Sequence, residues 1–238
     1  TLTITHDAPA IFPLGTTTVT FSATDSANNT GTATATVTVQ DGGTPVVTAP
    51  ANITVAASDA SGTLATDATI TAFLNGASAT DDVDTTLTIT HDAPAIFPLG
   101  TTTVTFSATD SANNTGTATA TVTVQDSGVP IVTAPANITV AASDASGTPA
   151  TDAAIASFLG GASATDNVDT TLTITHDAPA IFPLGTTTVT FSATDSANNT
   201  GTATATVTVQ DGRSEERRAG EAWEGRGWTG RAKKRRAG

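Results

Sequence analysis

The stretch GTTTVTFSATDSANNTGTATATVTVQ, residues 100–125, decides the fold. In its first part Val104, Phe106 and Ala108 alternate with threonine and serine, and in its second part alanine and valine alternate with threonine. Such period-two alternation predicts β-strands with one buried face and one solvent-facing face. The intervening DSANNTG consists largely of residues that are typical of turns. We therefore predict two antiparallel strands with an apolar inner face and a threonine-rich outer face.

This stretch lies within a longer segment that occurs three times without a difference, at residues 1–41, 86–126 and 171–211. The segments between the copies begin at Pro45 and Pro130 and are nearly identical to each other. A repeat of about this length can enclose its own hydrophobic core. We predict complete repeats at 45–126 and 130–211, and the C-terminal half of a truncated repeat at 1–41. Because the chain opens inside a repeat and contains no Met, we expect it to be an internal fragment of a longer protein.

The remaining runs of each complete repeat also alternate, and turn signals separate them. Roughly six or seven short strands of this kind are typical of a β-sandwich. One segment departs from the pattern: TDAAIASFLGG places Ile155, Phe158 and Leu159 on one helical face, after Thr151 or Asp152 as the N-cap. We therefore predict an all-β fold of tandem sandwiches with one short helix per repeat.

Charge is distributed very unevenly along the chain. All nine Lys and Arg residues lie at Arg213 or later, and residues 1–212 contain 18 Asp and no Glu. Such a surface repels nucleic acid and anionic membranes and attracts divalent cations. With no Cys present, no disulfide can join the repeats.

The last residues differ from the repeats in both composition and period. GRSEERRAGEAWEGRGWTGRAKKRRAG begins where the repeat stops, and RSEERR resembles the translation of a sequencing adapter. A basic tail that binds nucleic acid or membrane is the alternative interpretation. We predict that 212–238 is a non-native, disordered basic tail that is not part of the repeat fold.

Three segments carry a resemblance to a known family: DNVDTTLTITHDAP, FPLGTTTVTFSATDSANNTGTATATVTVQD and PVVTAPANITV. Together they are similar to the hyalin repeat (HYR) family over essentially all of residues 1–211. The resemblance implies tandem immunoglobulin-like β-sandwiches in an extracellular surface or adhesive protein, without catalysis. Many members carry cysteines that this chain lacks, and the helix-like insertion is not universal in the family.

In an immunoglobulin-like topology, alternate loops gather at the pole where the chain enters the domain. The loops ATDDVD and SATDSANNTG should therefore lie near the incoming linker. Hard divalent ions take six to eight oxygen ligands, which carboxylates and loop carbonyls supply. No cofactor is expected to be required, but calcium at the joints between repeats is a hypothesis. Its candidate ligands are Asp41, Asp81, Asp84 and Asp110 at one joint, and Asp126, Asp166, Asp169 and Asp195 at the next.

A plainer interpretation competes with calcium, because Asp and Asn are also the ordinary residues of turns and caps. Asn113, Asn114 and Gly116 fit turn chemistry, which leaves Asp110 as the ligand candidate in its loop. The spacing matches neither the EF-hand loop nor the nonapeptide calcium repeats. The replacement of Asp82 by Asn167 in the sister repeat argues against an essential carboxylate at that position.

The sequence gives no support for an enzyme. One His per repeat, with no Cys beside it, makes a poor zinc site, and His6, His91 and His176 fit the rim of a sandwich. No Gly-x-Ser-x-Gly elbow and no phosphate-binding loop is present.

These observations predict structural spacer repeats of an extracellular, cell-surface adhesin-like protein. Two alternatives stay open: the repeats are themselves the adhesive glycan- or cell-binding surface, or they are accessory modules of a secreted enzyme. The expected partners are an unidentified extracellular ligand or neighbouring repeats. Neither nucleic acid nor membrane insertion is expected for this fragment.

Overall fold

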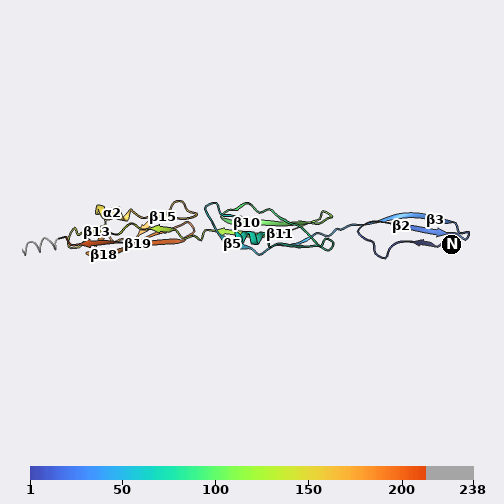
Figure 1. Ribbon diagram of the computed structural model, residues 1–238, viewed down its shortest axis with the longest axis horizontal. Helices are drawn as coiled ribbons and strands as arrows, with labels where there is room; N and C mark the ends of the chain where they lie inside the picture. The colour runs from blue at the N-terminus through green and yellow to red at the C-terminus, as the bar shows by residue number, and fades with distance from the viewer. Residues whose placement is uncertain (213–238) are drawn as a thin grey trace, which may run out of the picture. The chain divides into compact units, whose positions relative to one another are not determined.

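The computed structural model of the chain describes residues 1–212. The prediction for the basic tail falls, from residue 213 onward, outside the described residues. By compactness the chain divides into two units: Thr1–Val55 with Gly62–Gln125, and Ala56–Ser61 with the residues from Asp126 onward. Strands dominate both units, and each contains one short helix (Figure 1).

The principal sheet of the third copy has four strands in the order β13-β19-β18-β16. β18 and β19 form the long hairpin expected from the alternation, and Phe191 faces Ala203 across it. β16 pairs antiparallel with β18, whereas β13 pairs parallel with β19, with Ile138 beside Val207. The bounds are β13 Ile138–Ala141, β16 Ile174–His176, β18 Gly185–Thr194 and β19 Thr200–Gln210.

Two small sheets and a helix complete this repeat. β12 (Ile131–Thr133) pairs with β15 (Ser163–Thr165), and β14 (Thr148–Pro149) pairs with β17 (Ile181–Phe182). The helix α2 (Ala153–Leu159) buries Ile155 and Phe158. The alternating apolar residues of β18 and β19 join them in one core: Ile155, Phe158, Phe182, Val189, Phe191, Ala205, Val207 and Val209.

The second copy repeats this architecture. Its four-stranded sheet has the order β5-β11-β10-β8, and its two small sheets are β4-β7 and β6-β9. Its helix α1 (Ala68–Leu74) buries Ile70 and Phe73. The strands are β4 Val46–Thr48, β5 Ile53–Ala56, β6 Thr63–Leu64, β7 Ser78–Thr80, β8 Ile89–His91, β9 Ile96–Phe97, β10 Gly100–Thr109 and β11 Thr115–Gln125.

Residues 1–41 form only part of this fold. They make a three-stranded sheet in the order β1-β2-β3, with the bounds β1 Ile4–His6, β2 Gly15–Thr24 and β3 Thr30–Val39. Its register equals that of the complete repeats, since Phe21 faces Ala33 as Phe191 faces Ala203.

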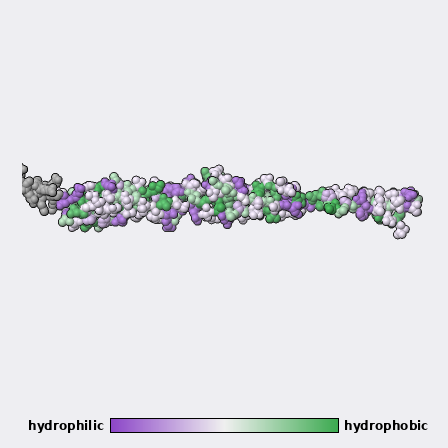
Figure 2. All heavy atoms as spheres, turned by 60° about the horizontal axis from the view of Figure 1, so that its bottom comes forward, coloured by the Kyte–Doolittle hydropathy of each residue, from purple (hydrophilic) through white to green (hydrophobic). Residues whose placement is uncertain are grey.

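The predicted all-β, immunoglobulin-like sandwich with one short helix per repeat is confirmed. Asp152 is the N-cap of α2, and its Oδ1 accepts hydrogen bonds from the backbone N–H groups of Ala154 and Ile155. The third copy has eight strands, more than the six or seven expected. The difference comes from β14 and β17, which have two residues each and are too short to show an alternating pattern. Most of the visible surface is near neutral in hydropathy, as expected for exposed threonine, serine and alanine (Figure 2). Among the described residues, no helix has the length and apolar character needed to cross a membrane.

Candidate metal centre

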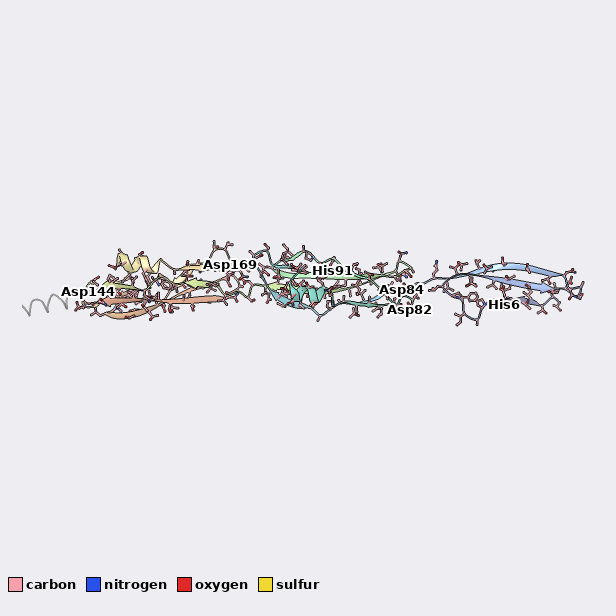
Figure 3. The ribbon with its side chains drawn as sticks, viewed as in Figure 1. His6, Asp82, Asp84, His91, Asp144 and Asp169 are labelled. Carbon is pink, nitrogen blue, oxygen red and sulfur yellow. The ribbon has the colours of Figure 1, made fainter. Side chains whose placement is uncertain are left out.

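The structure brings the eight predicted ligands together as two groups of four. The first acidic cluster is Asp41, Asp81, Asp84 and Asp110, and the second is Asp126, Asp166, Asp169 and Asp195. In each cluster one carboxylate oxygen per residue lies within 4.8 Å of those of the other three. Figure 3 labels Asp84 and Asp169, and each lies at one end of its own repeat. Three segments meet in each cluster: the linker before the repeat, the loop after its fourth strand (β7 or β15), and the loop of the long hairpin.

The hairpin loop holds Asp110 by turn chemistry. Oδ1 of Asp110 accepts a 2.7 Å hydrogen bond from the backbone N–H of Asn114, and its Oδ2 accepts one of 2.8 Å from Nδ2 of Asn114. Asn113 adopts φ 70°, a left-handed conformation that asparagine tolerates better than most residues. The expectation that the asparagines shape this turn is therefore confirmed, and the same turn presents a buried carboxylate to the cluster.

The loop after β7 supplies two carboxylates. Oδ1 of Asp81 accepts hydrogen bonds from the backbone N–H groups of Val83 and Asp84, at 2.9 and 3.0 Å. Oδ2 of Asp84 accepts hydrogen bonds from both N–H and Oγ–H of Ser111, each 2.9 Å long. Asp84 thereby fastens its loop to the hairpin loop that carries Asp110.

The linker reaches the cluster through Asp41. Its Oδ1 accepts a 2.9 Å hydrogen bond from the backbone N–H of Gly43, and its backbone carbonyl accepts one from Nδ2 of Asn114. Asn114 therefore connects two members of the cluster, Asp41 and Asp110. The second cluster has the same contacts, with Asn199 bonded to Asp195 and to the carbonyl of Asp126.

Four carboxylate oxygens in these clusters are buried and have no hydrogen-bond partner within residues 1–212. They are Oδ2 of Asp41, Asp81, Asp126 and Asp166. Buried polar atoms normally have a partner, because an unpaired one costs about 1–3 kcal/mol. No Lys or Arg occurs in residues 1–212 to neutralise them. Each cluster thus holds negative charge and free acceptor capacity that the described residues do not satisfy.

The pKa shifts follow from the same geometry. Burial raises the pKa of Asp126, a backbone hydrogen bond from Gly128 partly offsets this, and the negative charges of Asp166, Asp195 and Asp169 raise it further. Burial also opposes ionisation of Asp110, but its hydrogen bonds from Asn114 outweigh that effect, and its pKa lies below the usual value. The turn therefore favours the ionised form of Asp110.

The histidines lie outside both clusters. Nδ1 of His91 accepts a hydrogen bond from the backbone N–H of Ala93, and its ring packs edge-to-face on Phe106. Figure 3 shows His91 further along its repeat, apart from Asp84. The interpretation of the histidines as rim residues of the sandwich agrees with this position.

Two supporting residues escaped the sequence reasoning. Ser111 bonds Asp84, and Asn114 bonds both Asp41 and Asp110. The sequence predicts Asn114 only as a turn residue, because its contact with Asp41 spans 73 residues of sequence. Each hairpin loop has the local signal of Asp followed by Ser and Asn, but the contacts of that loop with the linker and with the other loop depend on the fold.

Comparison with known proteins finds a family model that is similar to one repeat. The HYR domain family model matches residues 126–209, and no curated protein matches the chain.

Solved structures similar to the chain include cadherin repeats. Protocadherin gamma B2 extracellular cadherin domains 3–6 match with 15% identity and a TM-score of 0.35, over 82% of this chain and 58% of that chain. Mouse cadherin-23 EC22-24 matches with 18% identity and a TM-score of 0.30, over 82% and 74%. The human desmocollin-1 ectodomain matches with 12% identity and a TM-score of 0.28, over 84% and 48%. These values are too low to bear on function. Over residues 126–209, which match the HYR domain model, the family match confirms the resemblance seen in the sequence.

Proposed function

We propose that the chain consists of non-catalytic spacer repeats of an extracellular, adhesion-type protein, and that each acidic cluster binds one calcium ion. The observation that carries the calcium proposal is the set of buried, unpartnered carboxylate oxygens, two in each cluster. Equivalent residues of the two repeats leave the same oxygens without a partner: Oδ2 of Asp41 and Asp81 in one cluster, and Oδ2 of Asp126 and Asp166 in the other. The HYR match supports the extracellular adhesion class.

The chemistry of the cluster favours calcium over other common metals. Its ligands are all carboxylate oxygens, whereas zinc prefers Cys and His, and no His joins either cluster. Calcium accepts six to eight oxygens in flexible geometry, and backbone carbonyls of the loops can add to the carboxylates. Magnesium demands near-ideal octahedral geometry and keeps several waters, which suits four crowded carboxylates less well.

The position of the clusters suggests what the ion would do. Asp41 and Asp126 stand in the linkers that precede the complete repeats, directly after the end of a long hairpin. An ion shared by a linker residue and two loops restrains the linker relative to the repeat that follows it. Removing the ion should therefore let the linker move more freely relative to that repeat. The stiffness of the spacer would then depend on the calcium concentration.

Calcium titration of the full chain tests this proposal. We expect calorimetry to show binding of one ion per cluster, with dissociation constants of about 10⁻⁴–10⁻³ M, in the range of extracellular modules. The melting temperature should rise with calcium, because an ion that binds only the folded state stabilises it. Magnesium at the same concentration should raise the melting temperature less than calcium does.

Matched variants separate a metal site from a general charge effect. Asp41→Asn together with Asp126→Asn removes one charge from each cluster, both at oxygens without a hydrogen-bond partner, and should weaken calcium binding. Asp82→Asn removes a nearby charge at a position where the other repeat already has Asn167, and should leave binding unchanged. No heat of binding and no thermal shift in the unmodified chain would refute calcium binding.

A further inference from the structure

Asp41 lies in a turn that folds its carboxyl group back over the backbone, and glycine follows it. Oδ1 of Asp41 accepts a 2.9 Å hydrogen bond from the backbone N–H of Gly43. Such an Asx-turn closes a ring that contains both Cγ of Asp41 and the backbone nitrogen of Gly42. Because glycine has no side chain to hinder the approach, this nitrogen can attack the carboxyl carbon of the preceding residue.

The backbone around Gly42 is lightly restrained. Within residues 1–212 the N–H of Gly42 donates no hydrogen bond, and Gly42 is exposed in a segment between β3 and β4. A Cβ on Gly42 would meet no atom within 4 Å. The carbonyl oxygen of Asp41 accepts a hydrogen bond of 3.3 Å from Nδ2 of Asn114, which is long for a bond of this kind. The attack by the Gly42 nitrogen therefore breaks no hydrogen bond of that nitrogen.

The equivalent linker has the same turn but a different central residue. Oδ1 of Asp126 accepts a 3.0 Å hydrogen bond from the backbone N–H of Gly128, and Ser127 stands between them. The side chain of Ser127 hinders the approach that Gly42 leaves open. The chain thus holds two matched turns, of which one has a glycine at the reacting position.

The structure also separates Asp41 from the Asn-Gly pair at Asn75, where the same kind of ring closure is chemically possible. The backbone N–H of Gly76 donates a 3.0 Å hydrogen bond to the carbonyl oxygen of Phe73, at the end of α1. Ring closure at Asn75 would break this bond. The helix end therefore protects Asn75, whereas no such bond protects Asp41.

We propose that Asp41 is a site of spontaneous modification, at which aspartate converts to isoaspartate through a succinimide. The Gly42 nitrogen forms a bond to Cγ of Asp41, and the bond from Cγ to one carboxyl oxygen breaks. That oxygen leaves as water with the carboxyl proton and the amide proton. Water then adds to the main-chain carbonyl carbon of the ring and breaks its bond to nitrogen, so that the chain continues through Cγ. The two steps lose and regain one water, and they need no oxidant, reductant or enzyme.

The modification changes the first acidic cluster. The main chain gains one carbon atom between Cα of Asp41 and Gly42, and Cγ becomes part of the backbone. The side-chain oxygen that bonds Gly43 is lost from its place. The free carboxylate stands where the carbonyl group bonded by Asn114 was. The first cluster therefore loses its linker carboxylate with time, whereas the second keeps that of Asp126 for longer.

Incubation of the full chain in EDTA at neutral pH, well below its melting temperature, tests the proposal without reference to calcium. Isoaspartate has the same mass as aspartate, so mass alone does not reveal it. Residues 1–212 contain no Lys or Arg for trypsin to cleave. A protease that cleaves before aspartate is therefore used, because it does not cleave before isoaspartate. Loss of cleavage at Asp41, with methylation by an isoaspartate methyltransferase, measures the product.

Exchange of the central residues between the two turns gives matched variants. In the unmodified chain we expect isoaspartate to form severalfold faster at Asp41 than at Asp126. Gly42→Ser should lower the rate at Asp41 to that at Asp126, and Ser127→Gly should raise the rate at Asp126. Each variant carries the residue that the other linker already has, so neither should disturb folding.

Calcium gives a second measurement, which rests on the proposed function. An ion bound by the carboxylate of Asp41 should slow its ring closure. Asp211, which is exposed and precedes Gly212, is the reference and should react at the same rate with and without calcium. Equal rates at Asp41 in EDTA and in calcium would contradict calcium binding at this cluster, while the isoaspartate formed would still support the modification.

Three results would overturn the modification proposal. One is the absence of isoaspartate at Asp41 under conditions in which a short peptide of residues 38–46 converts. Another is equal accumulation at Asp41 and Asp126 in the unmodified chain. A third is an unchanged rate at Asp41 in the Gly42→Ser variant, which would show that glycine does not control the reaction.

Discussion

Phe73 of α1 and Phe106 of β10 meet edge-to-face, at an interplanar angle of 67°. This contact joins the helix to the principal sheet, and the ring of Phe106 is fully buried beneath it. The helix has only seven residues, a length at which an isolated helix is not stable in water. Its stability therefore depends on Ile70 and Phe73 packing into the core.

Phe73→Ala should lower the free energy of unfolding of its repeat by about 3–5 kcal/mol, since it leaves a cavity over Phe106. Urea unfolding followed by circular dichroism measures the change. Leu64→Ala is the control, because Leu64 is 56% exposed and the loss of its side chain should cost little. A cost for Phe73→Ala as small as that of the control would mean that the helix does not stabilise the core.

Gly116→Ala should destabilise the second repeat by about 1–3 kcal/mol, the usual cost of forcing an extra methyl group into a packed site. The cause is the carbonyl oxygen of Pro45, which occupies the space of the new Cβ. Gly31→Ala changes the same residue in the same sequence context, and it should have almost no effect on the chain alone. Equal effects of the two substitutions would show that the strand itself, and not the covering segment, requires glycine.

The contrast between these two glycines shows how far the sequence could predict the structure. Alternation predicted the long hairpin, and the spacing of Ile155 and Phe158 predicted the helix, because both depend on local periodicity. The parallel addition of β13 to β19 could not be predicted, since it pairs residues far apart in sequence and has no local signal. The segment that occurs identically at 1–41, 86–126 and 171–211 also gives no local sign of whether the apolar face of its sheet is buried.

The acidic clusters were predicted for a different reason. A known topology fixes which loops share a pole of the domain, so the resemblance predicts that Asp81, Asp84 and Asp110 lie together. What the resemblance could not supply was the hydrogen bonding within the cluster. The buried, unpartnered Oδ2 of Asp41 and its bridge through Asn114 depend on side-chain orientation, which sequence patterns do not encode.

Acidification should destabilise the repeats through Asp92 and Asp177. Oδ1 of Asp92 accepts a 2.7 Å hydrogen bond from the backbone N–H of Thr105, and this bond holds the pKa of Asp92 below its usual value of 3.8. Because the pKa of each carboxylate is lower in the folded state than in the unfolded state, its ionised form stabilises the fold. This stabilisation is fully present at pH values above the unfolded-state pKa. It is lost as pH falls through the folded-state pKa.

Urea unfolding at a series of pH values below about 5 measures this loss. The double variant Asp92→Asn and Asp177→Asn keeps an acceptor oxygen in each place but does not titrate. It should be less stable than the unmodified chain at neutral pH, and its stability should depend less on pH in the acidic range. Parallel pH curves for the two proteins would assign the acid sensitivity to other carboxylates.

Asp81→Asn should have opposite effects with and without calcium. The amide keeps the oxygen that accepts hydrogen bonds from Val83 and Asp84, and it replaces an Oδ2 that has no partner within residues 1–212. In EDTA the variant should be at least as stable as the unmodified chain, because it relieves repulsion among four carboxylates.

In calcium at about a hundred times its dissociation constant, the unmodified cluster should gain about 2.7 kcal/mol of stability, and the variant much less. Thermal unfolding of both proteins in EDTA and in calcium measures the reversal, with Asp82→Asn as the charge-matched control. A turn residue without a metal role would behave otherwise, because its substitution would lower stability equally in both conditions. The reversal in sign therefore separates a calcium ligand from a carboxylate that only shapes its loop.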